Sequence, residues 1–310
     1  MNAKENYLQA IYYGSPDYVP LSCEPIAFGF SFDGIVKMTS WTDRWGVDWK
    51  LELAGMVPFP KGNPLADLAR LNDYVFPDPE GLILAEKTKY ELDHVDRVEK
   101  LIIGNMSYLL FERAWALMGL ERFLVALIEQ PCEVHELLHR VAIYAKKVFD
   151  RYLALGVDGI GFSEDLGSQR ALMISPSLFR EFLLPEYGFI FEHVIKEKKI
   201  INFHSCGCVD AIAGDLASIG ITVLNPVQAR ANDLNRLKAL VSSKMALNGG
   251  IDTHLLMTGT REQVCTETRR VLDILKPGGG YICGPDQYLP NMPQENLDAM
   301  WSTARSYGRY

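Results

Sequence analysis

Three residues in this chain have the types and spacing of a metal site. His204 and Cys206 stand at the end of one apolar segment, and Cys283 stands at the end of another, far downstream. At a strand end, side chains two positions apart point to the same side, and their Cα atoms lie roughly 6–7 Å apart, close enough to share an ion. Two thiolates and an imidazole suit zinc, and three protein ligands leave a fourth position open for chemistry. The alternatives are a core histidine beside cysteines that only pack, or Cys208 as a rival ligand.

Polar side chains also follow other apolar segments of the chain. They are Glu24, Asn105, Asp165 and Asn225. A carboxylate beside a metal can fill a coordination position, hold a proton or orient a ligating histidine, so Glu24 and Asp165 are our catalytic candidates. For Asp165, capping of the following helix is an equally good interpretation. We take the amides of Asn105 and Asn225 as candidates for substrate binding.

Aromatic residues gather between positions 28 and 49. Phe28 lies at the start of this segment, and Trp45 is the middle one of three tryptophans spaced four apart. Such spacing is more typical of a helical packing face than of a binding site. If the segment covers a pocket, however, the rings could form its wall against a flat aromatic molecule or a large cofactor. Phe28 and Trp45 are therefore further substrate-binding candidates.

Short apolar runs alternate with helical patterns from about residue 100 onward, which predicts parallel βαβ units. The expected strands are 101–105, 157–163, 200–204, 221–227, 245–251 and 281–285. With a first strand at 19–25 and one or two more within 40–100, we predict a (β/α)8 TIM barrel, an α/β fold, in a single domain, 1–310. The irregular N-terminal excursion should lie over the barrel mouth, where functional residues gather at the ends of the strands. A doubly wound sheet would alternate similarly, but no glycine-rich dinucleotide fingerprint follows the first strand.

Composition excludes several classes of function. The formal net charge of −8 and the lack of a basic block argue against a nucleic-acid partner. The N-terminus lacks the layout of a signal peptide, and no apolar stretch is long enough to span a membrane. We therefore expect a cytoplasmic protein with no membrane partner, whose six cysteines are mostly reduced.

The segments FHSCG and YICGPDQ, the latter followed by ENLDAM, resemble the zinc-dependent methyltransferases of the uroporphyrinogen decarboxylase superfamily. The resemblance covers residues 100–305 well and the first hundred more loosely. It implies a (β/α) barrel with Zn²⁺, in which His204, Cys206 and Cys283 match the ligands of the family. Metal-free decarboxylases of the same superfamily hold a porphyrinogen with arginines after the first strand. The matching stretch here, LSCEPIAFGFS, has no arginine to pair with carboxylates, which disfavours that branch.

The other branch moves methyl groups to or from the cobalt of a corrinoid carried by a partner protein. We predict a methyltransferase that takes the methyl group of a methoxylated aromatic compound, an aryl methyl ether, and passes it to the cob(I)alamin of a corrinoid protein. The aromatic segment and the missing arginine favour this donor. A coenzyme M-type thiol acceptor is the alternative, with Arg170 as the nearest anchor for its sulfonate. A metal-free decarboxylase-like enzyme and a binding protein with structural zinc are the more distant alternatives, and a homodimer is compatible with the sequence.

Overall fold

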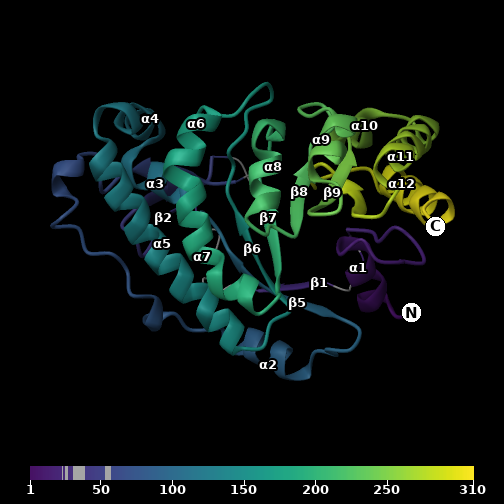
Figure 1. The fold of residues 1–310 in the computed structure, drawn as a ribbon, viewed down its shortest axis with the longest axis horizontal. Helices are drawn as coiled ribbons and strands as arrows, with labels where there is room; N and C mark the ends of the chain where they lie inside the picture. Colours follow the sequence, from purple (N-terminus) through teal and green to yellow (C-terminus); the bar gives the residue numbers. More distant parts are fainter. Residues whose placement is uncertain (23, 25–26, 31–38, 53–56) are drawn as a thin grey trace.

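The computed structural model describes residues 1–22, 24, 27–30, 39–52 and 57–310, with the backbone alone for 27–30. Its central sheet has seven parallel strands in the order β1–β5–β6–β7–β8–β9–β10 (Figure 1). The strands are β1 Ala27–Phe30, β5 Leu101–Met106, β6 Gly159–Ser163, β7 Ile200–His204, β8 Val223–Val227, β9 Ala246–Ile251 and β10 Tyr281–Pro285. The six strands expected after residue 100 are therefore confirmed, and they pair with their neighbours in chain order.

The segment before β1 joins the two edges of this sheet into a barrel. Leu21 forms a parallel bridge with Cys283 of β10. The N–H of Cys283 donates to the carbonyl of Pro20, and the N–H of Ser22 donates to the carbonyl of Cys283, both at 2.9 Å. A few residues later, β1 pairs with β5 at the opposite edge. The same stretch of chain thus contacts both ends of the strand order, which confirms the α/β barrel.

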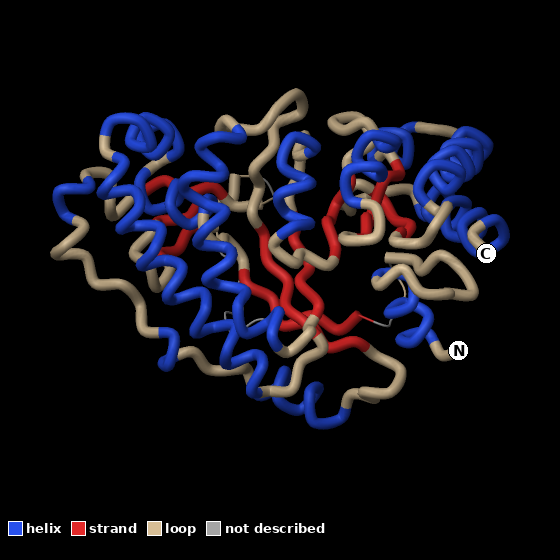
Figure 2. Tube along the Cα trace, in the orientation of Figure 1, coloured by secondary structure: helices blue, strands red, loops and turns tan. Residues whose placement is uncertain are grey.

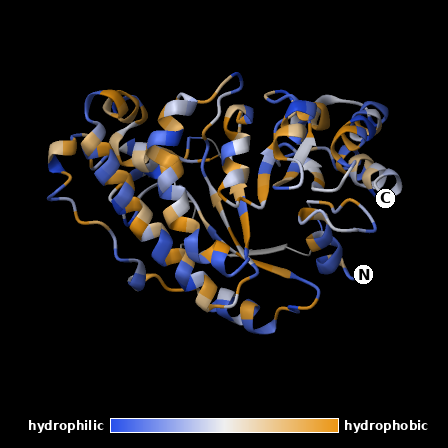
Figure 3. Ribbon diagram, in the orientation of Figure 1, coloured by the Kyte–Doolittle hydropathy of each residue, from blue (hydrophilic) through white to orange (hydrophobic). Residues whose placement is uncertain are grey.

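Helices surround the parallel strands on the outside (Figure 2). The helices are α1 Ala3–Ile11, α2 Glu86–His94, α3 Phe111–Met118, α4 Leu120–Glu129, α5 Pro131–Ala154, α6 Pro176–Leu178, α7 Leu184–Lys196, α8 Asp210–Ser218, α9 Leu234–Val241, α10 Thr253–Thr258, α11 Arg261–Leu275 and α12 Gln294–Tyr307. A π-helical turn, Phe179–Leu183, joins α6 to α7, and two short 3-10 helices cover Leu68–Arg70 and Pro79–Gly81. Apolar residues recur at three and four spacing along α5 and are buried against the sheet, so α5 shows polar and apolar patches in Figure 3. Among the described helices, none is both long and apolar enough to cross a bilayer.

The expectation of further barrel strands within residues 40–100 is wrong. In the described part of this region, β2 (Ser40–Thr42), β3 (Asp48–Lys50) and β4 (Phe59–Gly62) pair antiparallel in a separate small sheet. Asp43 sets the turn between β2 and β3, because its Oδ1 accepts from the N–H groups of Trp45 and Val47. Its Oδ2 accepts from Arg113 of α3 at 2.8 Å. The excursion is therefore fastened beside the carboxyl end of β5, which α3 follows.

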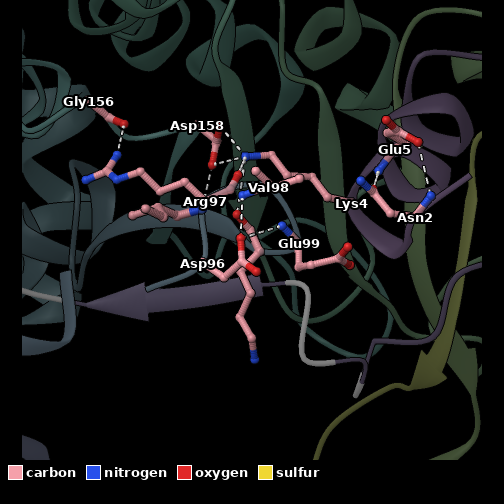
Figure 4. A network of polar contacts seen from close by, with 11 residues as sticks. Asn2, Lys4, Glu5, Asp96, Arg97, Val98, Glu99, Gly156 and Asp158 are labelled. Carbon is pink, nitrogen blue, oxygen red and sulfur yellow. Dashed lines mark hydrogen bonds and ion pairs between the residues drawn. The ribbon is translucent and has the colours of Figure 1, made fainter. Parts of the chain in front are cut away.

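Helix α1 closes the amino-terminal end of the barrel. Nζ of Lys4 lies 2.9 Å from both carboxylate oxygens of Asp158, just before β6, and donates to the carbonyl of Arg97 (Figure 4). Asp158 also accepts from the N–H of Ile102 in β5. Inside the barrel, a small aliphatic cluster fills this end; it consists of Ile11, Leu101, Ile103, Ile200, Val223, Ala246 and Ile282. The other half of the lumen, at the carboxyl ends of the strands, is left for polar side chains.

Candidate active site

A cavity of about 320 Å³ lies in the lumen, open toward the carboxyl ends of the strands. Part of its polar lining comes from neighbouring strands, since every second residue of a barrel strand faces inward. The strand residues are Asn202, His204, Asn225 and Asn248, and the segments beside the strands add Ser22, Glu24, Asp286, Gln287 and Tyr288. Leu101, Ile103 and Ile200 line its deep end. The cavity therefore has an apolar floor and a polar upper belt.

Asp165, His204 and Cys206 form a cluster at the rim of this cavity. One ligand atom from each lies within 4.8 Å of the others. Nε2 of His204 is 3.7 Å from Sγ of Cys206 and 3.9 Å from Oδ1 of Asp165. Donor atoms bound to one tetrahedral ion at about 2.0–2.3 Å are spaced similarly, and nitrogen, sulfur and carboxylate oxygen are the donors that zinc takes. The residues present thus fit a three-ligand zinc site with one position open.

Two hydrogen bonds orient the ligand atoms of this cluster. Nδ1 of His204 lies 3.0 Å from Oδ1 of Asn225, which can only accept, so the ring proton is on Nδ1 and the lone pair of Nε2 faces the cluster. The backbone N–H of Cys206 donates to Oδ1 of Asp165 at 2.8 Å and holds the carboxylate beside the thiol. Asn225 is therefore a positioning residue for the histidine; it also lines the cavity, and its predicted contact with substrate stays a prediction.

Cys283 is not a member of this cluster, so its predicted role as a ligand stays a prediction. The Asp165–His204–Cys206 group is the ligand group found among the described residues, and Cys283 is fully buried outside it. The strand alternation explains its position. Ile282 packs in the lumen cluster, whereas Cys283 belongs to the main core cluster outside the sheet. Asp165, proposed from the sequence as a carboxylate near the metal, occupies the third place.

Two buried glutamates that the sequence analysis did not select, Glu164 and Glu112, lie near the cluster. Glu164 is fully buried, and its oxygens accept from the N–H groups of Leu110, Phe111 and Glu112, at the start of α3, and from the hydroxyl of Tyr187 at 2.6 Å. It therefore caps the start of α3, a role that the sequence analysis considered only for Asp165 and for the following helix. Burial raises the pKa of Glu164 to about 7 despite these donors.

Glu112 is the member of this group that faces the cluster. Burial raises its pKa to about 8, with Asp165 and Glu164 adding to the effect. Burial and the neighbouring Asp165 carboxylate also raise the pKa of the Cys206 thiol to about 12. A glutamate inside an otherwise apolar helical stretch, LLFERAWALM, was the sequence signal that could have identified Glu112. The rim of the cavity is thus rich in negative or potentially negative groups.

The upper belt of the cavity contains two amides and one carboxyl that the sequence analysis did not select. Asn202 precedes His204 by two positions in β7, Asn248 lies in β9, and Asp286 follows β10. Polar residues at inward positions of apolar strands were the available signal. Burial raises the pKa of Asp286 to about 7. Burial also raises the pKa of Glu24, a catalytic candidate from the sequence, which lines the cavity.

Comparison with known proteins identifies the family of the chain. The family model of uroporphyrinogen decarboxylase (URO-D) matches residues 62–307. The chain belongs to this family. It is 22% identical over 268 residues to the uroporphyrinogen decarboxylases of Azoarcus sp. (strain BH72) and Aromatoleum aromaticum, a match that covers 79% of this chain and 70% of each relative.

Solved structures show the same fold. A methyltransferase from Methanosarcina mazei superposes with a TM-score of 0.72 at 16% identity, covering 99% of each chain. A B12-independent methionine synthase from Shewanella sp. W3-18-1 superposes with a TM-score of 0.50 at 13% identity, covering 81% of this chain and 70% of that one. At these identities the similarity concerns the barrel alone.

Among the remaining candidates of this uroporphyrinogen decarboxylase family member, Trp45 and Asn105 lie outside the cavity lining. Trp45 is 3% exposed and packs edge-on against Tyr144, with the guanidinium of Arg113 4.8 Å from its ring centre. It is a core residue, so its assignment to a substrate pocket is wrong. The side chain of Phe28 lies outside the described residues. Asn105 is the last residue but one of β5; its Oδ1 lies over Gly161 of β6, and the residue is outside the cavity lining.

Proposed function

We propose that this protein is a zinc-dependent methyltransferase that moves a methyl group from a methoxylated aromatic compound to the cob(I)alamin of a corrinoid protein. The observation that carries the proposal is the Asp165–His204–Cys206 cluster, whose donor atoms lie within 4.8 Å of one another at the rim of a lumen cavity. The likeness of the barrel to a methyltransferase from Methanosarcina mazei supports it. The family to which the chain belongs is one of enzymes.

The reaction needs a group that stabilises the leaving oxygen. In the proposed reaction the methyl group would pass from the aryl oxygen to the cobalt(I) of the partner's corrinoid, which would supply the electron pair for the new bond, and the aryl oxygen would leave as phenoxide and later take up a proton. Zinc held by Asp165, His204 and Cys206 would supply Lewis acidity at that oxygen. The open coordination position would face the cavity, because His204 contributes to both the cluster and the cavity lining.

The side chains of the protein orient the reactants and hold protons. Asn225 fixes the ring of His204, and the N–H of Cys206 fixes Asp165. Glu24 and Asp286 line the cavity, and burial raises the pKa of both, that of Asp286 to about 7. A carboxyl group with a pKa near the working pH can deliver a proton to a departing oxygen and be recharged from solvent. Asp286 is therefore the proton donor that we assign to the phenoxide, and Glu24, whose pKa burial also raises, lines the same cavity.

The alternatives fit the cavity less well. No lysine or arginine lines it in the part of the chain that the structure describes. Arg170, the anchor considered for a sulfonate, is exposed and lies outside the lining. An alkanesulfonate thiol or a porphyrinogen with several carboxylates would find no cation to pair with there. A purely structural metal would need four protein ligands, and the described cluster offers three.

Cobalt absorbance tests the proposed reaction directly. The zinc-loaded protein is incubated with a reduced corrinoid protein and a panel of methoxylated aromatics, and conversion of cobalt(I) to methyl-cobalt(III) is followed. We expect conversion with at least one aryl methyl ether and none with the Cys206→Ala variant. Turnover only in the reverse sense, with a thiol demethylating methyl-cobalamin, would establish the alternative, and activity that survives complete removal of zinc would refute the proposal.

A further inference from the structure

The lumen cavity reaches along the barrel from the carboxyl end of the strands to their amino end. In β7 the first residue, Ile200, the middle one, Asn202, and the last, His204, all line it. Four steps of about 3.3 Å along a strand that is tilted by about 35–45° correspond to about 10 Å along the barrel axis. Because side chains in layers usually fill the lumen of a TIM barrel, an open length of this kind indicates a binding site for an elongated molecule.

Tyr7 of α1 forms the far end of this cavity. It lines the cavity together with Leu101, Ile103 and Ile200, and it packs against the aliphatic cluster at the amino end of the barrel. The three aliphatic residues come from the first halves of β5 and β7 and form side walls, whereas α1 closes the end. Burial raises the pKa of Tyr7 well above its ordinary value, so the phenol stays neutral and adds no charge to this end.

Polar contacts on both sides of Tyr7 hold α1 in place. Nζ of Lys4 lies 2.9 Å from both carboxylate oxygens of Asp158. The fully buried side chain of Asn6 donates to the carbonyl of Tyr18 at 3.0 Å. A molecule longer than the cavity would have to break these contacts to push the helix away, so the ring of Tyr7 acts as a fixed stop.

The width of the cavity restricts how a molecule can lie in it. A volume of about 320 Å³ over a length of about 10 Å gives a mean cross-section of about 30 Å². This width admits one aromatic ring or one alkyl chain lengthwise, but not two rings side by side. The aliphatic walls of the deep half favour an apolar substituent there, and the cluster that contains His204 lies at the opposite end.

We infer that Tyr7 is a specificity-determining residue that limits the length of the molecule bound in the lumen. The inference rests on the proposed function only in naming that molecule and its direction. A single-ring aryl methyl ether would lie lengthwise, with its reacting oxygen at the Asp165–His204–Cys206 cluster and its para substituent toward Tyr7. Short apolar para substituents gain affinity through burial, whereas longer ones meet the ring of Tyr7 and are rejected.

A series of probes of increasing length tests the inference without any catalysis. The full chain, kept metal-free by a chelator, is titrated calorimetrically with phenol and with 4-alkylphenols whose unbranched chains run from methyl to hexyl. Each methylene that enters the lumen should tighten binding about fourfold, and the first one that meets Tyr7 should weaken it at least about fivefold. Binding that tightens without a break up to the hexyl compound, or no binding by any member of the series, overturns the inference.

Variants of α1 test whether Tyr7 is the stop. Tyr7→Ala leaves a cavity where the ring was, so the break should move to chains that are at least about two carbons longer. Tyr7→Phe keeps the ring and should leave the break within about one carbon of its place. Leu8→Ala is the matched control, because Leu8 packs against the same aliphatic cluster from the same helix but does not line the cavity, and the break should stay.

The position of the break distinguishes a stop from a merely structural role. A general loss of packing would weaken binding of every probe alike and leave the break in place. If Tyr7→Ala does not fold, Tyr7→Leu also shortens the side chain and should move the break by at least about one carbon. An unmoved break in a folded Tyr7→Ala or Tyr7→Leu protein, or an equal shift in Leu8→Ala, contradicts the inference.

The cobalt assay separates this inference from the proposed function. If no methoxyarene is demethylated while the 4-alkylphenols show the break and its shift, the proposed function fails and the limit set by Tyr7 stands. If 4-alkylanisoles are demethylated equally well at every chain length and the phenols show no break, the proposed function stands and the inference fails.

Discussion

Replacing Asn225 with leucine should weaken zinc binding, because the amide oxygen orients the ring of His204. Nδ1 of His204 donates to Oδ1 of Asn225 at 3.0 Å, which leaves Nε2 facing Sγ of Cys206 at 3.7 Å. Leucine has a similar volume but cannot accept a hydrogen bond, so neither the tautomer nor the ring orientation would be fixed. Loss of such an outer partner typically lowers metal affinity 10–100-fold, which corresponds to about 1.4–2.7 kcal/mol.

Competition with a chromogenic chelator measures this effect on the purified protein. Asn225→Asp supplies a stronger acceptor at the same place and should bind zinc at least as well as the wild type, whereas a loss of packing alone would not be rescued in this way. Asn202→Leu is the matched control, since Asn202 lies in the same cavity but does not contact His204 through any hydrogen bond of the described structure. Zinc affinity within twofold of wild type in a folded Asn225→Leu variant would refute the role of Asn225.

Three further outcomes follow from the site and its surroundings. In the same chelator competition, Cys283→Ala should keep zinc affinity within twofold, because Cys283 lies outside the cluster. Cys206→Ala should lower zinc affinity at least about a hundredfold. Equal losses in the two variants would establish Cys283 as a ligand. Glu164→Gln should lower the free energy of unfolding by about 2–4 kcal/mol in urea titrations. The reason is that the amide can accept from only part of the donors, so that about two hydrogen bonds are lost. A cost below about 1 kcal/mol would show that the start of α3 does not depend on this carboxylate. In the metal-free protein the free energy of unfolding should fall as pH rises from about 4.5 to 8. Glu112 and Glu164 have pKa values of about 8 and about 7 in the folded state, against 4.5 in the unfolded state. The folded state therefore holds more protons than the unfolded state in that pH window. Glu112→Gln should flatten this slope, and an unchanged slope in that variant would contradict the assignment.

The strands after residue 100 could be predicted from the sequence, and those before it could not. Each strand from β5 to β10 is an apolar run of five or six residues between helical patterns, and parallel strands buried on both faces have this signature. The strands β2, β3 and β4 have only three or four residues. The tryptophan spacing that resembled a helix comes from a hairpin instead, because Trp41 and Trp49 are cross-strand partners with ring centres 6.4 Å apart.

The position of Cys283 apart from the cluster has a specific physical cause. Strand ends were correctly expected to bring His204, Cys206 and Asp165 together, since the carboxyl ends of neighbouring parallel strands meet at one end of the barrel. Which face of a strand points inward cannot be read from an apolar run such as YICGP, because both faces of a barrel strand are buried. A shift by one residue exchanges Ile282 and Cys283 between lumen and outer core, and the packing of Ile282 in the lumen cluster decides it.

If the cluster binds zinc, one carboxylate and one thiolate with a neutral imidazole would balance the two positive charges of the ion, as two thiolates with an imidazole also would. The rim is acidic, since burial and then the neighbouring Asp165, Glu112 and Asp286 raise the pKa of the Cys206 thiol. Every raised pKa in this region has burial as its largest cause and nearby carboxylates as a further one at Cys206, Glu112 and Asp286. A cation at this rim would lower the pKa of each of these groups, so a proton release on metal binding is the electrostatic signature that we expect of the proposed site.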